Sequence, residues 1–361
     1  MKAMVVTRFG GPEVMVLQHL PDPEPGEGQV LVDVEFSDVG TLDRLIRAGK
    51  FSEVFNLAPP YVPGGAVGGV VRAVGPGGGA AWVGKRVIGG TGAREVDGGS
   101  AAPTGGYAEL ALVDQGALIE VPDGLDLDVA TSLFNDGTTS QLLLDVAMPT
   151  VDDRVLVLAA AGAAGTLLVQ LLTGRGVPVV AAARGAAKTA VLRELGASAV
   201  VDYGEPDWPQ RVRAMFADGP TVVLDGAGAE LGGIGFALAA DGARVISYGT
   251  GAGEFAELSR DEARLRGITV TGLFELPSPG PAERAALLQR AFTAATEGAA
   301  RPLLSRVPLA QAVKAHATLE DRSAIGKTLL TTSHSDPTSA EVPHRRGVPQ
   351  HGGTHGGSDG P

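Results

Sequence analysis

The stretch that decides the fold reads Arg154-Val-Leu-Val-Leu-Ala-Ala-Ala-Gly162-Ala-Ala-Gly165-Thr-Leu-Leu-Val-Gln-Leu-Leu172. Its apolar run at 155–158 predicts a buried strand, the small residues at 159–162 predict a turn, and the spacing of the leucines after Gly165 predicts one face of a helix. Such a turn lets a pyrophosphate approach the backbone N–H groups at the helix start. We therefore expect a dinucleotide to contact Ala161, Gly162, Ala163, Ala164 and Gly165.

The glycine pattern of this turn is degenerate, because Ala160 stands where a strict G-x-G-x-x-G sequence has its first glycine. Taken alone, the pattern fits close packing of a helix on a strand equally well. The following sequence favours the dinucleotide site, since it predicts further strands at 177–183, 199–202, 222–225 and 244–248 with helical or glycine-rich segments between them. This alternation predicts a doubly wound parallel sheet.

The end of the second predicted strand indicates which dinucleotide binds. Sites for NAD usually carry an acid there, which accepts hydrogen bonds from the ribose 2′-hydroxyl. This chain instead has Arg184 and Lys188, and a guanidinium pairs well with phosphate. The pattern favours NADPH over NADH. The alternative is that both cations are simply solvated at the start of a helix.

The remainder of the chain predicts a second, β-rich unit. Short strands between Gly/Pro turns indicate a compact barrel or sandwich, and we expect them at 2–7, 14–17, 29–36, 67–74, 85–89 and 105–113. A short helix is expected at 42–48, a strand at 268–274, helices at 282–298 and 309–319, and a last strand at 327–331. The segment 333–361 is rich in Ser, Thr, Gly, Pro and His, so we expect it to be disordered.

Composition excludes several classes of function. The net charge of −12 argues against a nucleic-acid partner, and the lack of cysteine excludes disulfides and thiolate chemistry. We see no signal peptide and no apolar run of about 18 residues, so we expect a cytoplasmic chain with no membrane partner. Zinc sites need three or four nitrogen or sulfur ligands, yet the chain before residue 333 offers only His19 and His316. We predict no metal site.

A set of ordered motifs resembles a known superfamily. They include Pro25-Gly-Glu-Gly-Gln-Val-Leu-Val32, Gly105-Gly-Tyr107-Ala-Glu109 and Gly326-Lys327-Thr-Leu-Leu330. The chain resembles the medium-chain dehydrogenase/reductase superfamily, in its zinc-free, zeta-crystallin-like quinone oxidoreductase branch. The resemblance implies a GroES-like substrate domain at 1–126 that is completed by 269–332, and a Rossmann-like NADPH-binding domain at 127–268. It also implies a homodimer.

The resemblance assigns further cofactor-binding residues. Thr139 takes the place of a threonine that contacts the nicotinamide carboxamide, and Tyr203 matches a tyrosine near the adenosine 2′-phosphate. Gly249 and Gly251 follow the fifth strand, where relatives pass the nicotinamide ribose. The alternatives are that Thr138 or Thr139 caps a helix and that Tyr203 packs at the end of a strand.

Departures from the family pattern point to the acceptor site. Relatives usually have Val-Asn-Pro where this chain has Val-Gly-Thr, and Leu45 and Phe51 stand where tyrosines are expected. We take Thr41, Tyr61 and Asp136 as the candidate catalytic residues. The alternative for Asp136, which replaces an apolar residue or proline, is an N-cap of the following helix.

These observations predict a zinc-independent, NADPH-dependent reductase that transfers a hydride to a quinone or an α,β-unsaturated carbonyl. Much of the acceleration in such a reaction comes from positioning, and solvent can supply the proton. One alternative is an enoyl or 2-alkenal reductase of secondary metabolism. Another is an NADPH-binding protein with little turnover, because the usual asparagine and tyrosines are missing.

Overall fold

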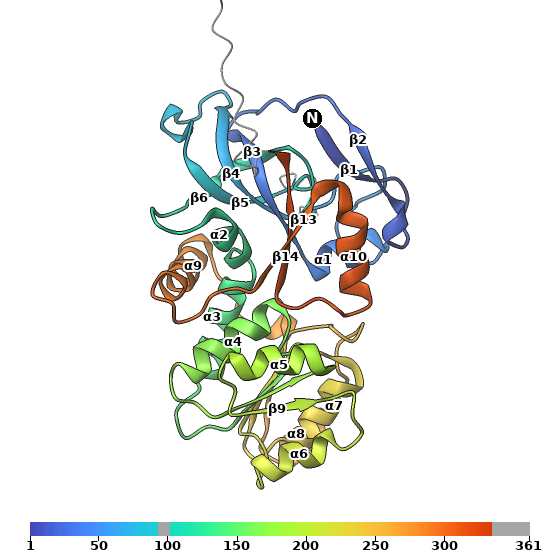
Figure 1. Ribbon diagram of the computed structural model, residues 1–361, viewed down its shortest axis with the longest axis vertical. Helices are drawn as coiled ribbons and strands as arrows, with labels where there is room; N and C mark the ends of the chain where they lie inside the picture. Colours follow the sequence, from blue (N-terminus) through green and yellow to red (C-terminus); the bar gives the residue numbers. More distant parts are fainter. Residues whose placement is uncertain (93–101, 334–361) are drawn as a thin grey trace, which may run out of the picture.

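The chain folds around two six-stranded sheets, described in a computed structural model that covers residues 1–92 and 102–333. The first sheet has the strand order β12-β11-β10-β7-β8-β9, and its neighbouring strands are all parallel. The second has the order β13-β14-β3-β4-β5-β6 and is closed by a further pairing of β3 with β6. The two sheets form the lower and upper halves of the molecule (Figure 1).

The parallel sheet is covered on both faces by helices. Its central strands β7 (Val155–Leu158), β8 (Val179–Ala183) and β10 (Val222–Asp225) are buried along their whole length. This explains their continuous apolar sequence, since a parallel sheet is shielded on both sides. One face carries α3 (Asp136–Ala147), α4 (Ala163–Thr173) and α5 (Ala186–Glu194), and the other carries α6 (Trp208–Met215), α7 (Ala229–Leu238) and α8 (Arg260–Leu265). The edge strands are β9 (Ala199–Asp202) and β12 (Thr269–Gly272), and β11 (Arg244–Ser247) lies between β12 and β10.

The β-rich half is assembled from both ends of the chain. Its strands β3 (Gln29–Val39), β4 (Ala66–Val74), β5 (Arg86–Thr91) and β6 (Leu110–Glu120) come from the N-terminal third. Strands β13 (Leu304–Pro308) and β14 (Lys327–Thr331) come from the C-terminal part, and β14 pairs antiparallel with β3. A hairpin of β1 (Lys2–Val6) and β2 (Met15–His19) and the helices α1 (Thr41–Arg47) and α10 (Ala312–Glu320) complete this half.

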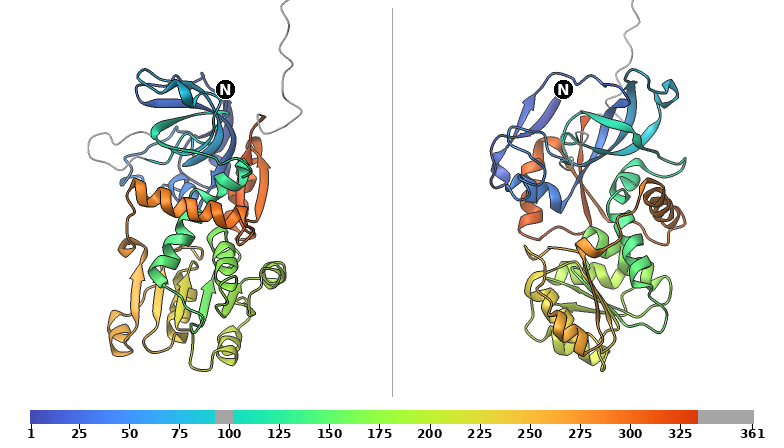
Figure 2. Two further views of the ribbon diagram at one scale, coloured as in Figure 1. Left: turned by 90° about the vertical axis from the view of Figure 1, so that its left-hand side faces the viewer. Right: turned by 180° about the vertical axis from the view of Figure 1, so that it is seen from behind.

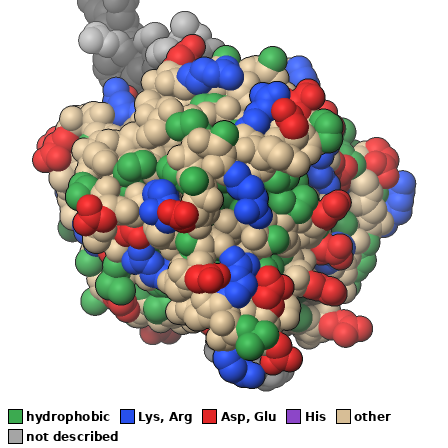
Figure 3. All heavy atoms as spheres, turned by 90° about the horizontal axis from the view of Figure 1, so that it is seen from below, with side chains coloured by type: hydrophobic (Ala, Val, Ile, Leu, Met, Phe, Trp, Pro, Cys, Tyr) green, Lys and Arg blue, Asp and Glu red, His purple; other side chains and the backbone are tan. Residues whose placement is uncertain are grey.

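The junction between the two halves is made of helices. Helix α9 (Pro281–Thr296) packs on α3 and on α2 (Leu127–Leu133), and it runs across the molecule between the two sheets (Figure 2). None of the helices in the described residues has the length and apolar character that a membrane span needs. At the end of the molecule formed by the parallel sheet, acidic and basic side chains are interspersed without a patch of one sign on this face (Figure 3).

The fold class predicted from the sequence is confirmed: a GroES-like β-rich half and a Rossmann-like parallel sheet. The bounds expected for the strand at 105–113 are wrong, because β6 begins at Leu110 and extends to Glu120. The residues before it bond elsewhere: Tyr107 N donates to Pro63 O at 2.8 Å and Met4 N donates to Tyr107 O at 2.9 Å. The domain boundaries stay a prediction, and the disorder expected for 333–361 falls outside the described residues except for Ser333.

Candidate functional site

The turn after β7 has the geometry expected of a phosphate-binding helix start. Gly162 is the N-cap of α4, and the Thr166 N–H donates to the Gly162 carbonyl oxygen at 2.9 Å. As at any helix start, the N–H groups that come before Thr166 in the first turn have no carbonyl partner four residues earlier within the helix. A Cβ atom on Gly165 would lie 2.6 Å from the Ala160 carbonyl oxygen, so only glycine allows this close contact of helix and strand. The small residues here therefore serve both packing and backbone exposure.

The start of β14 docks onto this same turn. Gly326 N donates to the Ala161 carbonyl oxygen at 2.8 Å, and Gly326 forms an isolated parallel bridge with Gly162. The C-terminal strand of the β-rich half is thus bonded directly to the glycine turn of the parallel sheet.

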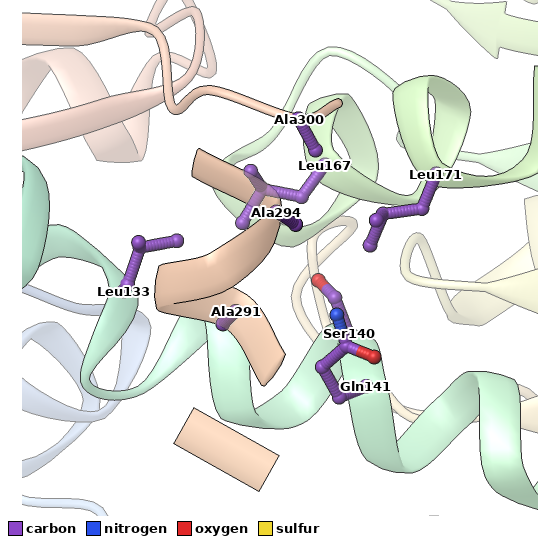
Figure 4. A pocket seen from close by; sticks show the side chains of 9 residues that line it. Leu133, Ser140, Gln141, Leu167, Leu171, Ala291, Ala294 and Ala300 are labelled. Carbon is purple, nitrogen blue, oxygen red and sulfur yellow. The ribbon is translucent and has the colours of Figure 1, made fainter. Parts of the chain in front are cut away.

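Helix α3 lies beside the turn from the other side. Ser140 Oγ donates to the Ala164 carbonyl oxygen at 3.3 Å, which joins the first turns of α3 and α4. The N-cap of α3 is Asn135, so neither Thr139 nor Asp136 caps it, and Asp136 is the first helical residue. The capping alternatives considered for these two residues are therefore wrong. Further along, α3, α4 and α9 enclose a small gap lined mostly by leucine and alanine, which is a packing defect between helices (Figure 4).

Two glycines bring the loops after β10 and β11 together. Gly249 N donates to the Asp225 carbonyl oxygen at 3.2 Å, and Gly251 N donates to the Gly226 carbonyl oxygen at the same distance. A Cβ atom on Gly249 would lie 2.4 Å from the Gly226 carbonyl oxygen, so this position requires glycine.

A cavity of about 520 Å³ opens at the carboxyl ends of β8, β9 and β10. Its charged lining residues are Arg184, Arg322, Glu205 and Glu230, and both guanidinium groups lie close enough to the Tyr203 phenol to interact with it. The whole lining is formed by Arg184, Tyr203, Gly204, Glu205, Pro206, Trp208, Pro209, Ala229, Glu230, Leu231, Ile234, Ala252 and Arg322. Ligands of doubly wound sheets bind at this edge.

The cations near this cavity differ in their accessibility. Lys188 Nζ donates to the Arg322 carbonyl oxygen at 2.6 Å, and burial, followed by the charge of Arg184, lowers the pKa of Lys188. Arg322 Nη2 donates to the Ala252 carbonyl oxygen at 2.8 Å. Arg322 could not be identified from the sequence. It lies in the link between α10 and β14, far along the chain from Arg184 and Tyr203, and only the folded structure brings it to the same cavity. Arg184 and Tyr203 line the cavity, whereas Lys188 is not among its lining residues, and the assignment of all three to the cofactor stays a prediction.

Asp38, Asp136 and Lys327 form a buried charged group that we call the acid–lysine cluster. Lys327 Nζ lies 2.8 Å from Asp136 Oδ2 and also contacts Asp38 Oδ1. Asn135 Nδ2 donates to Asp38 Oδ2 at 2.9 Å. Burial raises the pKa of Asp38 despite the nearby ammonium. The cluster joins β3, β14 and the start of α3, and sequence reasoning named only Asp136 as a site residue.

The other two candidate catalytic residues lie near α1. Thr41 is the exposed first residue of α1, and Tyr61 has a buried hydroxyl group without a hydrogen-bond partner in the described structure. Asp43 Oδ2 accepts a hydrogen bond from Gly40 N at 2.8 Å, and burial, followed by the charge of Asp38, raises the pKa of Asp43 to about 7. No hydrogen bond between the Thr41, Tyr61 and Asp136 side chains occurs within residues 1–92 and 102–333.

His316 is a structural residue. Arg47 Nη1 lies 3.1 Å from His316 Nδ1, and Tyr107 Oη lies 3.0 Å from His316 Nε2. Arginine can only donate, so Nδ1 is the acceptor and Nε2 carries the proton. Burial, followed by the charges of Arg47 and Arg44, lowers the pKa of His316 to about 3. Within the described part of the chain, no three His, Asp or Glu side chains are grouped as a metal ion would require. That the site works without zinc stays a prediction.

Comparison with known proteins assigns the family. The chain matches the model of the alcohol dehydrogenase GroES-like domain at residues 26–123 and that of zinc-binding dehydrogenases at 163–291. It is 30% identical over 343 residues to a quinone oxidoreductase of Lama guanicoe, with 91% of this chain and 97% of that protein covered. The chain belongs to the quinone oxidoreductase branch of the medium-chain dehydrogenases/reductases.

Two further proteins are similar to this chain. A mycobacterial protein whose structure was solved in complex with NADPH is 32% identical, has a TM-score of 0.80, and is matched over 92% of this chain and 99% of that one. A 2-haloacrylate reductase of Burkholderia sp is 32% identical over 230 residues, which is 63% of this chain and 66% of that protein. The family resemblance stated from the sequence motifs is confirmed.

Proposed function

We propose that the chain is an NADPH-dependent reductase that transfers a hydride to a quinone or an α,β-unsaturated carbonyl compound. The observation that carries the proposal is the cavity with Arg184, Tyr203 and Arg322, which lies at the same sheet edge as the glycine turn. Two guanidinium groups beside a phenol suit a ribose 2′-phosphate, which NADH lacks. The similar mycobacterial protein was solved with NADPH.

Each part of the cofactor would meet a different segment. The 2′-phosphate would contact Arg184, Tyr203 and Arg322, with Lys188 adding charge from behind. The pyrophosphate would lie on the turn formed by Ala161, Gly162, Ala163, Ala164 and Gly165. The nicotinamide half would extend toward Thr139 and toward Gly249 and Gly251. When bound, the cofactor supplies the hydride.

The acceptor would lie between α1, the segment at Tyr61 and the start of α3. Thr41, Tyr61 and Asp136 are the polar groups that we propose to face it. Hydride transfer to a quinone or enone needs correct positioning and one proton, and it needs no Lewis acid. We therefore propose that the reaction is independent of zinc.

The first test is NADPH oxidation, followed by absorbance at the reduced-nicotinamide band. The acceptors are an ortho-quinone, a para-quinone, a 2-alkenal and a cyclic enone, with NADH run in parallel. Turnover with NADPH and at least one acceptor, unchanged by a chelator, is the expected result. Loss of activity with the chelator would contradict zinc independence, and faster oxidation of NADH would contradict the choice of cofactor.

The similarity to a 2-haloacrylate reductase favours one alternative, a reductase of other unsaturated acids or aldehydes, including an enoyl or 2-alkenal reductase of secondary metabolism. Turnover of the 2-alkenal without turnover of the quinones would select it. The absence of the family's usual active-site asparagine, with Gly40 in its place, favours a second alternative, an NADPH-binding protein with little turnover. Tight NADPH binding without oxidation across the panel would select that one.

We also propose a homodimer that forms along the edge of the parallel sheet. Strand β12 is an outer strand, and unpaired outer strands readily pair with another chain. The neighbouring Leu265 and Phe274 side chains are 89% and 84% exposed, which is unusual for large apolar residues.

A further inference from the structure

The acid–lysine cluster has a charge imbalance that the family resemblance does not account for. Two carboxyl groups, those of Asp38 and Asp136, share the single ammonium group of Lys327. The side chains of Asp38 and Lys327 are only 3% and 6% exposed, and that of Asp136 is 22% exposed. No other Lys or Arg in residues 1–92 and 102–333 forms an ion pair with either carboxyl group. With both acids ionised, the cluster would carry a net charge of −1.

A buried group with a net charge of −1 favours uptake of a proton, because burial penalises the charged form. The more deeply buried acid is Asp38, and its pKa is raised by burial. The other titratable groups that interact with the cluster do not supply a cation: they are Asp43 on α1, Tyr107, and Tyr248 at the end of β11. Asn135 donates a hydrogen bond to Asp38 and adds no charge. The cluster is therefore neutral when Asp38 carries a proton.

The position of the cluster gives this proton a use. Asp136 begins α3, one turn before Thr139, and it interacts electrostatically with Tyr248 at the carboxyl end of β11. Gly326, next to Lys327, is bonded to the glycine turn at Ala161. The cavity lined by Arg184 and Tyr203, which we propose to hold the 2′-phosphate, lies on the β8–β9 side of that turn. The nicotinamide half of a dinucleotide would then fall on the β10–β11 side, where Asp136 interacts with Tyr248.

We propose that Asp136 donates the proton that accompanies hydride transfer, and that Asp38 and Lys327 store and relay this proton. The proposal rests on the proposed function, because it needs an acceptor in the cleft. Asp136 Oδ2 is buried and lies 2.8 Å from Lys327 Nζ, whereas 22% of the side chain as a whole is exposed, so the exposed part of the side chain lies away from this oxygen. Asp136 is the catalytic residue of the three, and the other two are positioning residues.

The step balances in atoms and charge. The acceptor gains a hydride on carbon from the bound cofactor, and negative charge collects on its oxygen. Asp136 receives a proton from Lys327 and gives it to that oxygen, while Asp38 passes its carboxyl proton to Lys327 in the same step, so that Lys327 remains an ammonium group. The cluster ends as two carboxylates and one ammonium group, and it regains one proton from water. The acceptor has then gained one hydride and one proton.

The kinetic test compares D136N and D38N with D145N, which removes an exposed acid of the same helix that pairs with Arg290. With NADPH and the best acceptor of the panel, we expect kcat to fall by about 100-fold in D136N, the range of a lost general acid. The NADPH Kd should stay unchanged. In the wild type kcat should decline as pH rises, and in D38N this decline should be lost. Wild-type kcat and an unchanged pH profile in D136N and D38N would overturn the proposal.

A second measurement needs no cofactor and no turnover. The infrared C=O band of a protonated carboxyl group is recorded for the whole chain at neutral pH, as a difference between the wild type and each variant. We expect a band that D38N removes and that D145N leaves in place, with D43N recorded separately because burial also raises the pKa of Asp43. Absence of a band that belongs to Asp38 would overturn the proton store. If the wild type oxidises no NADPH, the proposed function is refuted. The infrared measurement would still decide whether Asp38 stores a proton.

Discussion

Replacing Arg184 with alanine tests most directly whether the cavity lined by Arg184 and Tyr203 holds the 2′-phosphate of NADPH. Arg184 lines the cavity beside Tyr203, and Arg322 stands on the same side. A charge-assisted hydrogen bond contributes about 1.5–3 kcal/mol, and the exposure of Arg184 places it at the lower end. We therefore expect R184A to raise the Kd for NADPH about tenfold, since about 1.4 kcal/mol corresponds to a factor of ten.

The same change should leave NADH almost unaffected, because NADH has no 2′-phosphate. The assay is isothermal titration of both cofactors to the wild type, R184A, K188A and R193A. Arg193 is an exposed cation on the same helix, α5, and provides the matched control. K188A should weaken NADPH by no more than about threefold, because the Lys188 ammonium is bonded to the Arg322 carbonyl oxygen. Equal weakening of NADPH and NADH by R184A would refute the 2′-phosphate assignment.

Three further predictions address stability, pH and assembly. Lys327→Met should lower the free energy of unfolding by about 3–5 kcal/mol, because it leaves the Asp38 and Asp136 carboxyl groups without their ammonium partner, and a loss below about 1 kcal/mol in denaturant titration would contradict this. Burial raises the pKa of Asp43 from 3.8 to about 7, so its contribution to stability is present below pH 3.8 and is lost as pH rises through about 7. Between pH 4 and 8 the free energy of unfolding should therefore fall less in D43N than in the wild type, with a difference of at most about 4 kcal/mol between the two losses. Melting temperatures that fall in parallel with pH in both proteins would count against this prediction. Phe274→Asp should convert a dimer into a monomer by light scattering without lowering the melting temperature, and a dimer that persists would exclude this edge.

The sequence allowed much of the parallel sheet to be predicted. Strands 155–158 and 222–225 were expected with the bounds that they have, because both faces of each are buried and their sequences are continuously apolar. Helix α2 (Leu127–Leu133) was not expected, because all seven of its residues are buried, the polar Asp128, Thr131 and Ser132 included, so it lacks the exposed face that marks a surface helix. The strand at β6 was placed too early, because Tyr107 pairs with distant backbone at Met4 and Pro63 instead of continuing the strand.

The candidate site could be predicted only where its residues follow the glycine turn or a strand end. Arg184 and Tyr203 follow β8 and β9 directly, so local sequence identified them. Arg322 and Lys327 reach the site through the pairing of β14 with β3, a contact between the two ends of the chain. Asp38 lies within β3 and acquires its partner only from that pairing, and no local pattern marks such a residue.

The central claim is that the glycine turn at Gly162 and the cavity lined by Arg184 and Tyr203 hold NADPH. The most direct measurement is a calorimetric titration of the full-length wild type with NADPH and, separately, with NADH. We expect one NADPH site per chain and an affinity for NADPH about tenfold or more above that for NADH. No heat of binding with NADPH, or a higher affinity for NADH, would contradict it.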